Sequence, residues 1–385
     1  MAGLWAGHFA TDLAQGVPPA LLVFLVPKLG LSYTLAAVVV LVATISSSVV
    51  QPAFGLWSDK RGAMWLLPAG VALAGLGVAL AAVAPTYPLL LLAVLVSGIG
   101  VAAFHPEGSK FASYVSGVRR ASGMAVFSVG GNLGFALGPL VASVLVLSLG
   151  LDGGLLLVVP CAAVALLLVV EGRYLARFVP EGGRTRFESS ERDQPKAFVL
   201  LLVVVVLRSV PHFGLFTFVP LWEKANGASD ERATVLLSLF LAAGAVGTLV
   251  GGPLADRIGR KPVLIGSYVA TVPLVIVYVL VGGIAGDVAL AFAGATVIST
   301  FGITIVMSQE YLPSRIGLAS GMSIGLAIGL GGVFAVVLGG VADAIDLQTA
   351  MLAIASAPLA GALLAVALPP VRAARLVERP EALPT

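Results

Sequence analysis

Long apolar stretches follow one another along the whole chain, separated by short segments rich in glycine, proline and charged residues. A helix needs about 20 apolar residues to cross a hydrocarbon core of about 30 Å. The apolar residues run continuously, without the two-residue alternation of a barrel strand, so they predict an all-α membrane protein. Twelve stretches are long enough to predict transmembrane helices, near Leu4–Val26, Tyr33–Leu56, Met64–Ala84, Tyr87–Ala112, Ala121–Leu149, Leu155–Tyr174, Ala197–Leu221, Arg232–Leu254, Pro262–Gly282, Val288–Glu310, Gly317–Val341 and Leu347–Leu368.

The composition excludes an ordinary soluble domain. Of 385 residues, 59% are hydrophobic and 11% are charged, whereas a globular protein carries about 25% charged residues. So few charged side chains cannot cover a soluble fold of this length, so lipid is the expected neighbour. The lysines and arginines form no stripe with interleaved aromatic residues, so no nucleic-acid partner is expected. The single cysteine, Cys161, leaves no intramolecular disulfide.

The positive charges are unevenly divided between the two sides of the predicted membrane. Of the 22 Lys and Arg residues, eighteen fall in the loops and termini of one side, three fall on the other, and Arg208 lies inside a span. This bias predicts a multi-pass protein of the cell inner (plasma) membrane with both termini in the cytoplasm. The apolar start lacks a positive leading region and contains His8 and Asp12, so we interpret it as the first span and not as a signal peptide.

The longest hydrophilic stretch divides the twelve spans into six and six. Residues 173–196 carry mixed charge, Pro180 and a Gly-Gly pair, which is typical of a linker. The expected organisation is a six-helix bundle over residues 1–172, a cytoplasmic linker over 173–196, a second six-helix bundle over 197–368 and a cytoplasmic tail over 369–385.

The two halves repeat each other. The segment Gly55–Gly62 recurs in Gly252–Lys261, 197 residues later, and Ala121–Met124 recurs in Ala319–Met322, 198 residues later. This repeat predicts two pseudo-symmetric bundles related by an axis along the membrane normal, with a substrate site near the midplane between them. Glycine stripes predict close packing of the fifth and eleventh spans; they consist of Gly123, Gly130, Gly134 and Gly138, and of Gly321, Gly325, Gly329 and Gly332.

The repeated segments resemble the major facilitator superfamily. Its loop motif after helix 2, Gly-x-x-x-Asp-Arg/Lys-x-Gly-x-Arg/Lys-Arg/Lys, is matched fully at Gly252–Lys261 and in its first part at Gly55–Gly62. Three further segments resemble the fosmidomycin-resistance subfamily of drug efflux proteins: Gln51–Lys60, Phe104–Ser109 and Val129–Leu140, the last with the glycine-proline pattern of antiporters. The resemblance implies a transporter with a small-molecule substrate.

The resemblance leaves proton coupling open. The arginine that many drug antiporters of the superfamily carry on helix 4 is absent, and Val94 lies near its expected place. A charged side chain at the bilayer centre costs about 2.5–3.5 kcal/mol on insertion scales, so each ionisable residue inside a span is a functional candidate.

On the first span, His8, Asp12 and Gln15 share one helix face. Asp12 can exchange a proton during transport or contact the substrate; alternatively, the face is a structural hydrogen-bond stripe or Asp12 is an interfacial cap. On the fourth span, Glu107 is a candidate proton carrier next to His105, or it forms an ion pair with Lys110 or Arg119. Glu310 in the second half has the same two interpretations. The proton-coupling candidates are Asp12, His105, Glu107 and Glu310.

On the seventh span, Arg208 and His212 lie one turn apart around Pro211. A buried guanidinium needs a counter-charge. Arg208 therefore pairs permanently with one of the three candidate carboxylates or meets an anionic group of the substrate, and the surplus of carboxylates favours one of them being protonated in the empty site. The substrate-binding candidates are Arg208, His212, Asn132, Gln15 and Phe216.

The loop motifs predict a conformational latch of the outward-facing state, formed by Asp59, Lys60, Asp256, Arg257, Arg260 and Lys261. No metal site is expected, because the three histidines lie on three helices without ligand spacing. No cofactor is expected either. The absence of a phosphate-cradling loop and of a readable nucleophile–base pair argues against an enzyme and against an ATP-driven pump.

The expected function is proton-coupled efflux of a small molecule or drug by a monomeric secondary transporter that works by alternating access. The alternative is proton-coupled uptake of a small organic anion, with Arg208 and His212 as the anion clamp.

Overall fold

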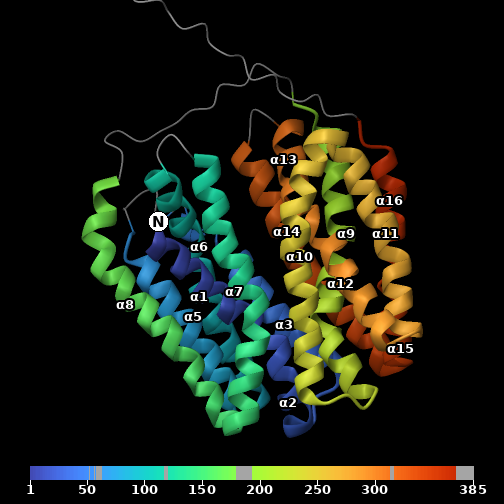
Figure 1. The fold of residues 1–385 in the computed structure, drawn as a ribbon, viewed down its shortest axis with the longest axis horizontal. Helices are drawn as coiled ribbons and strands as arrows, with labels where there is room; N and C mark the ends of the chain where they lie inside the picture. Colours follow the sequence, from blue (N-terminus) through green and yellow to red (C-terminus); the bar gives the residue numbers. More distant parts are fainter. Residues whose placement is uncertain are drawn as a thin grey trace, which may run out of the picture.

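The computed structural model describes residues 1–51, 53–55, 57, 63–116, 120–178, 193–312 and 316–369. Regular structure in these ranges is helical, and twelve helices or helix pairs are long and apolar enough to cross a membrane. The predicted all-α fold with twelve spans is therefore confirmed, and the chain is a multi-pass membrane protein (Figure 1).

Each predicted span coincides with a helix or with consecutive helical segments. The spans are α1 (Ala2–Gly16) with α2 (Pro18–Leu29), α3 (Tyr33–Ser48), α5 (Leu66–Val83), α6 (Tyr87–Ser116), α7 (Arg120–Leu149), the 3-10 helix η2 (Leu151–Leu157) with α8 (Val158–Leu175) and η3 (Ala176–Phe178), α9 (Pro195–Ala225), α10 (Asp230–Ile258), α11 (Arg260–Leu280), α12 (Gly283–Ser299) with α13 (Phe301–Tyr311), α14 (Ile316–Ala344), and α15 (Leu347–Ala353) with α16 (Ser356–Val366). The first span is interrupted before Pro18 and Pro19, which lack the N–H groups that would continue the helical ladder.

Glycines let α7 lie directly against α1. A Cβ atom at Gly134 would overlap the carbonyl oxygen of Phe9, and one at Gly138 would overlap that of Leu13. Since only a hydrogen atom fits at these contacts, the predicted close packing of the fifth span is confirmed for these glycines. For the eleventh span the prediction is wrong at Gly325 and Gly329, where an added Cβ would meet nothing within 4 Å.

The first and second halves of the chain meet through α2, α3 and α7 of the first half and α9, α10 and α14 of the second. In Figure 1 the blue-to-green helices lie on one side and the yellow-to-red helices on the other, and α3 packs against α14, α7 against α10, and α2 against α9. We call the end of the molecule where α8 ends and α9 begins the linker end, and the other the far end. The pairs of helices that join the halves run to the far end.

Two polar contacts close the far end between the halves. The carboxylate of Asp343, at the end of α14, accepts hydrogen bonds from the backbone N–H groups of Tyr33 (2.8 Å) and Thr34 (2.9 Å), the first residues of α3. Thr234 of α10 donates a hydrogen bond to Ser143 of α7 at 2.8 Å. Asp343 thus caps the N-terminus of a helix from the other half of the chain.

Replacing Asp343 by alanine should open this end. Loss of a cap costs about 1 kcal/mol, so the ratio of molecules open to closed at the far end should rise about fivefold. The measurement is the rate at which an introduced Gln15→Cys thiol reacts with an impermeant maleimide added from the far side, because the one native thiol, Cys161, is buried. Asp343→Asn keeps a capping oxygen and serves as the control. Equal rates in the alanine variant and the wild type would contradict this role for Asp343.

Candidate functional site

Helices α1 and α6 bring two histidines onto one carboxylate. Asp12 Oδ2 lies 3.2 Å from His8 Nε2, and Asp12 Oδ1 lies 3.1 Å from His105 Nε2. The side chains of His8, Asp12 and His105 are 12%, 14% and 23% exposed, so water reaches them only partly. Gly131 of α7 covers the cluster, since a Cβ at this position would lie against both His8 Nε2 and Asp12 Oδ2. We call these three residues the His-Asp-His cluster.

The other ring nitrogens fix where the histidine protons are. His8 Nδ1 lies 2.8 Å from the carbonyl oxygen of Phe127, and His105 Nδ1 lies 2.9 Å from that of Val101. A carbonyl oxygen only accepts, so each Nδ1 carries a hydrogen. Each Nε2 can then donate to Asp12 only when its ring holds a second proton. Without it, a lone pair faces the carboxylate, and Asp12 Oδ1 is a buried oxygen without a donor.

The His-Asp-His cluster is therefore fully hydrogen-bonded when it holds two exchangeable protons, and loses one hydrogen bond for each proton that leaves. One ligand atom from each residue lies within 4.8 Å of the others, which is close enough for the three to share a metal ion. The direct N–O contacts of 3.1 and 3.2 Å are hydrogen-bond distances. We interpret the cluster as a proton-binding site. The spacing of the histidines along the sequence, which is not that of a metal site, did not indicate that His8 and His105 meet.

The other candidate carboxylates have basic partners of their own. Glu107 is buried and its carboxylate lies 2.8 Å from Lys110 Nζ, which is one of the two partners considered for it. Glu310 of α13 pairs with Arg260 at the start of α11. The inference that three carboxylates compete for one arginine is thus wrong, because Glu107 and Glu310 take the alternative that was left open for them, an ion pair with a nearby base.

Arg208 has no carboxylate partner among the described residues. It is 4% exposed. Its one hydrogen bond within those residues runs from Nη1 to the carbonyl oxygen of Val297 at 3.4 Å, and its Nε has none. The guanidinium carbon lies 5.2 Å from the ring centroid of Phe301. One turn away, Nδ1 of His212 is buried without a hydrogen-bond partner. Arg208 and the His-Asp-His cluster are not in contact.

Of the remaining substrate candidates, Phe216 lies at a contact between the halves. Phe216 of α9 stacks on Phe135 of α7 with ring centroids 5.1 Å apart, and His212 stacks on Phe216 at 6.5 Å. Gln15 and Asn132 are half-buried and make no side-chain hydrogen bond within the described residues, so their amide groups are available to a ligand.

Part of the predicted latch can be located. Asp59 and Lys60 lie outside the described residues, and Asp256 and Arg257 are exposed. Arg260 pairs with Glu310, and Lys261 donates to the carbonyl oxygens of Val366 and Leu368, both at 2.6 Å. Arg260 and Lys261 thus tie the start of α11 to α13 and to the end of α16, which are contacts within the second half of the chain.

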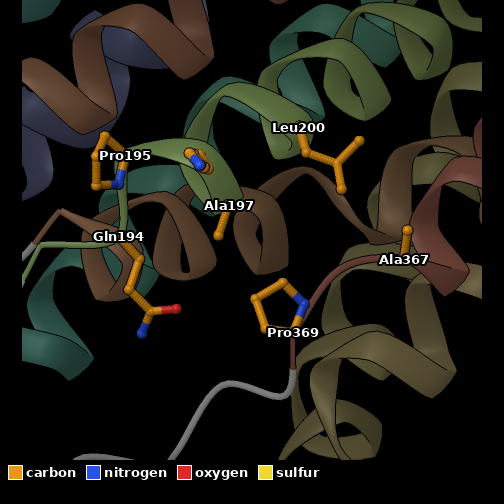
Figure 2. Close-up of a pocket in the computed structure, with 7 residues that line it drawn as sticks. Gln194, Pro195, Ala197, Leu200, Ala367 and Pro369 are labelled. Atoms are coloured by element: carbon orange, nitrogen blue, oxygen red, sulfur yellow. The ribbon is translucent and has the colours of Figure 1, made fainter.

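A cavity of about 500 Å³ lies at the linker end, beside the start of α9 (Figure 2). None of the predicted site residues lines it. Its lining consists of Gln194, Pro195, Lys196, Ala197, Leu200, Ala367 and Pro369.

Two residues of the site region escaped the sequence analysis. Asp343 gave no signal, because it lies directly before a loop, where charged residues are common. Thr300 interrupts the tenth span although no proline lies between residues 283 and 311. A polar run, Ser299-Thr300, was the only signal for this interruption.

Comparisons with known proteins place the chain in a family. A family model described as Major Facilitator Superfamily matches residues 4–335. The chain is 33% identical over 375 residues to an uncharacterized MFS-type transporter of Bacillus subtilis (94% of this chain, 90% of the relative) and 32% identical over 324 residues to the fosmidomycin resistance protein of Escherichia coli (82% and 79%).

The fold agrees with solved transporters. A bacterial homologue of the human lysosomal transporter Spinster, in an inward-facing and occupied conformation, superposes with a TM-score of 0.78, at 14% identity and over 95% of both chains. Because the identity is this low, the similarity supports the fold and nothing beyond it. Together with twelve helical spans and the loop motif at Gly252–Lys261, these matches show that the chain is a secondary transporter of the major facilitator superfamily and not an enzyme.

Proposed function

We propose that the protein exports a small molecule or drug in exchange for protons by alternating access. The observation that carries this proposal is the His-Asp-His cluster, which needs exchangeable protons to satisfy its buried oxygens and nitrogens. The similarity to a protein whose name states fosmidomycin resistance supports export. The proposed driving force is the proton gradient.

The cluster links proton number to a contact between helices. His8 and Asp12 lie on α1, and His105 lies on α6. When a proton leaves His105, its Nε2 no longer donates to Asp12, so the contact between α1 and α6 weakens. A state that holds α1 and α6 together therefore binds protons more tightly than one that separates them, and by linkage protons favour the first state. Glu107, held by Lys110, is the second candidate carrier on the same helix.

The orientation of the protein in the membrane is inferred from the uneven distribution of Lys and Arg. We propose that the linker end faces the cytoplasm, with both termini there, in the inner (plasma) membrane. The proposed moving bodies are the six-helix bundles 1–172 and 197–368 of a monomer, joined by 173–196. The contacts of Asp343 and Thr234 then close the outer side and must break before the exported molecule leaves.

The test is transport by protein reconstituted into vesicles that contain a pH-sensitive dye. Addition of a transported drug, found from the drug tolerance of expressing cells, should move protons in the direction opposite to the drug. Accumulation of drug on the same side as the arriving protons would instead show uptake. Drug movement without any proton movement would contradict coupling.

A further inference from the structure

The tenth span is broken inside the membrane without a proline. α12 ends at Ser299 and α13 begins at Phe301, and Thr300 between them has φ −91° and ψ 0°. A helix break at this depth leaves backbone carbonyl and N–H groups that need partners from elsewhere. The two sides of the break differ in how they are satisfied.

The carbonyl side has partners. Ser267 Oγ of α11 donates to the carbonyl oxygen of Thr296 at 2.8 Å. Arg208 Nη1 of α9 donates to that of Val297, and Thr248 Oγ1 of α10 donates to that of Ile298 at 3.5 Å. Three neighbouring helices thus supply donors to the end of α12, which is the negative end of its dipole.

The N-terminal end of α13 has no side-chain cap among the described residues. Thr300 precedes the first turn of α13, but its side chain makes no capping hydrogen bond, and its fully buried hydroxyl oxygen has no partner. The positive end of α13 is therefore uncapped in the interior. Gly302, the second residue of α13, is exposed, and a Cβ atom there would meet nothing within 4 Å.

Arg208 adds a full positive charge at the same place. Its guanidinium lies over the ring of Phe301, the first residue of α13, and its Nε is unpartnered although the side chain is 96% removed from solvent. A buried cation without a counter-charge is costly. An anion bound between Arg208 and the N-terminus of α13 would neutralise the guanidinium, accept hydrogen bonds from Nε and from Thr300, and compensate the helix dipole.

We propose that the break between α12 and α13 is the binding site for an anionic group of the transported molecule. The proposal rests on the transport function proposed above, but not on its direction. Arg208 and Thr300 would hold the anionic group, with Phe301 beside it. His212, one turn along α9 from Arg208, and Phe216 lead from this site to the contact with Phe135, so an aromatic or apolar body would extend along them. The substrate class is an organic anion with an apolar body.

The test is equilibrium binding to purified protein in detergent, without any gradient. The probes are phenylphosphonate and phenylacetate as anions, benzyltrimethylammonium as the matched cation, and benzyl alcohol as the neutral compound. The anions should raise the thermal unfolding temperature and give saturable titrations at pH 7, whereas the cation and the alcohol should do neither. Equal stabilisation by the cation or the alcohol would overturn the proposal.

Variants locate the site. Arg208→Gln should weaken binding of the anions about 10- to 100-fold, as expected for hydrogen bonds to a charged group. Thr300→Val, which keeps the shape of the side chain, should weaken it about threefold to tenfold. Arg232→Gln is the control, because Arg232 pairs with Glu223 and Asp287 at the far end; its affinity should equal that of the wild type. Wild-type affinity in either Arg208→Gln or Thr300→Val would overturn the proposal, so the outcome does not depend on one variant folding.

The experiment separates this site from the proton coupling. Anion binding without a gradient reports on Arg208 and Thr300 alone, and it should survive if the vesicles show no proton movement. Conversely, if the four probes bound equally well whatever their charge, the anion site would be wrong, but an observed exchange of protons for a transported drug would still support the proposed coupling.

Discussion

Asp12→Asn should reduce drug-driven proton movement in vesicles by about tenfold or more, which corresponds to losing hydrogen bonds to a charged group. Asparagine has the shape of aspartate but no negative charge, so it cannot hold two protonated histidines. Its amide group can donate to the Nε2 of one neutral histidine. That contact would then have its hydrogen bond without an exchangeable proton. Drug exchange down its own gradient should remain, because the variant keeps the packing of α1.

Asp287→Asn is the matched control for this experiment. Asp287 pairs with Arg232 at 2.7 Å at the far end, so its loss changes the same number of charges away from the cluster. Proton movement in this variant should equal that of the wild type. If Asp12→Asn retained drug-driven proton movement while Glu107→Gln lost it, the carrier would be Glu107 and the assignment of the cluster would be wrong.

Gly134→Ala should destabilise the folded protein by about 1–3 kcal/mol, the usual cost of overpacking, or prevent its folding. The added methyl group would overlap the carbonyl oxygen of Phe9 and lie 2.9 Å from the backbone nitrogen of Leu13. Both contacts are backbone atoms of α1, which cannot rotate away. The measurement is the thermal unfolding temperature of the purified protein in detergent.

Gly329→Ala is the control on the corresponding span of the second half. An added Cβ at Gly329 would meet nothing within 4 Å, and alanine favours a helix over glycine by about 1 kcal/mol. This variant should therefore unfold at the wild-type temperature or above it. Equal unfolding temperatures for Gly134→Ala and Gly329→Ala would show that the packing of α7 on α1 is not the limiting contact.

The spans could be predicted from the sequence because the membrane requires each one to be long and apolar by itself. Hydropathy says nothing about which side chains face one another. His8 and His105 lie 97 positions apart (105 − 8), on α1 and α6, which approach each other at Gly7, where a Cβ atom would overlap the ring of Phe104. The break at Thr300 involves donors from three other helices, so the polar pair Ser299-Thr300 is its only local signal.

The charged residues show the same limit. Arg208 was recognised as a buried cation that needs an anion, and the choice between a carboxylate of the chain and a ligand could not be made from composition. It depended on Glu107 and Glu310 being held by Lys110 and Arg260. Lys110 lies three residues from Glu107 on the same helix, so this pair is local, whereas Arg260 lies on another helix than Glu310, so their pairing is decided by tertiary packing.

The closure by Asp343 uses amide hydrogens of the opposite helix together with the side-chain hydroxyl groups of Ser32 and Thr34. The two backbone hydrogen bonds need only an N–H at positions 33 and 34, so the side chain at position 33 can change without losing them, whereas Thr34 also contributes its hydroxyl group. Proline is the exception. It is well tolerated as the first residue of a helix, so at position 33 it would leave α3 intact while removing one of the two hydrogen bonds across the halves.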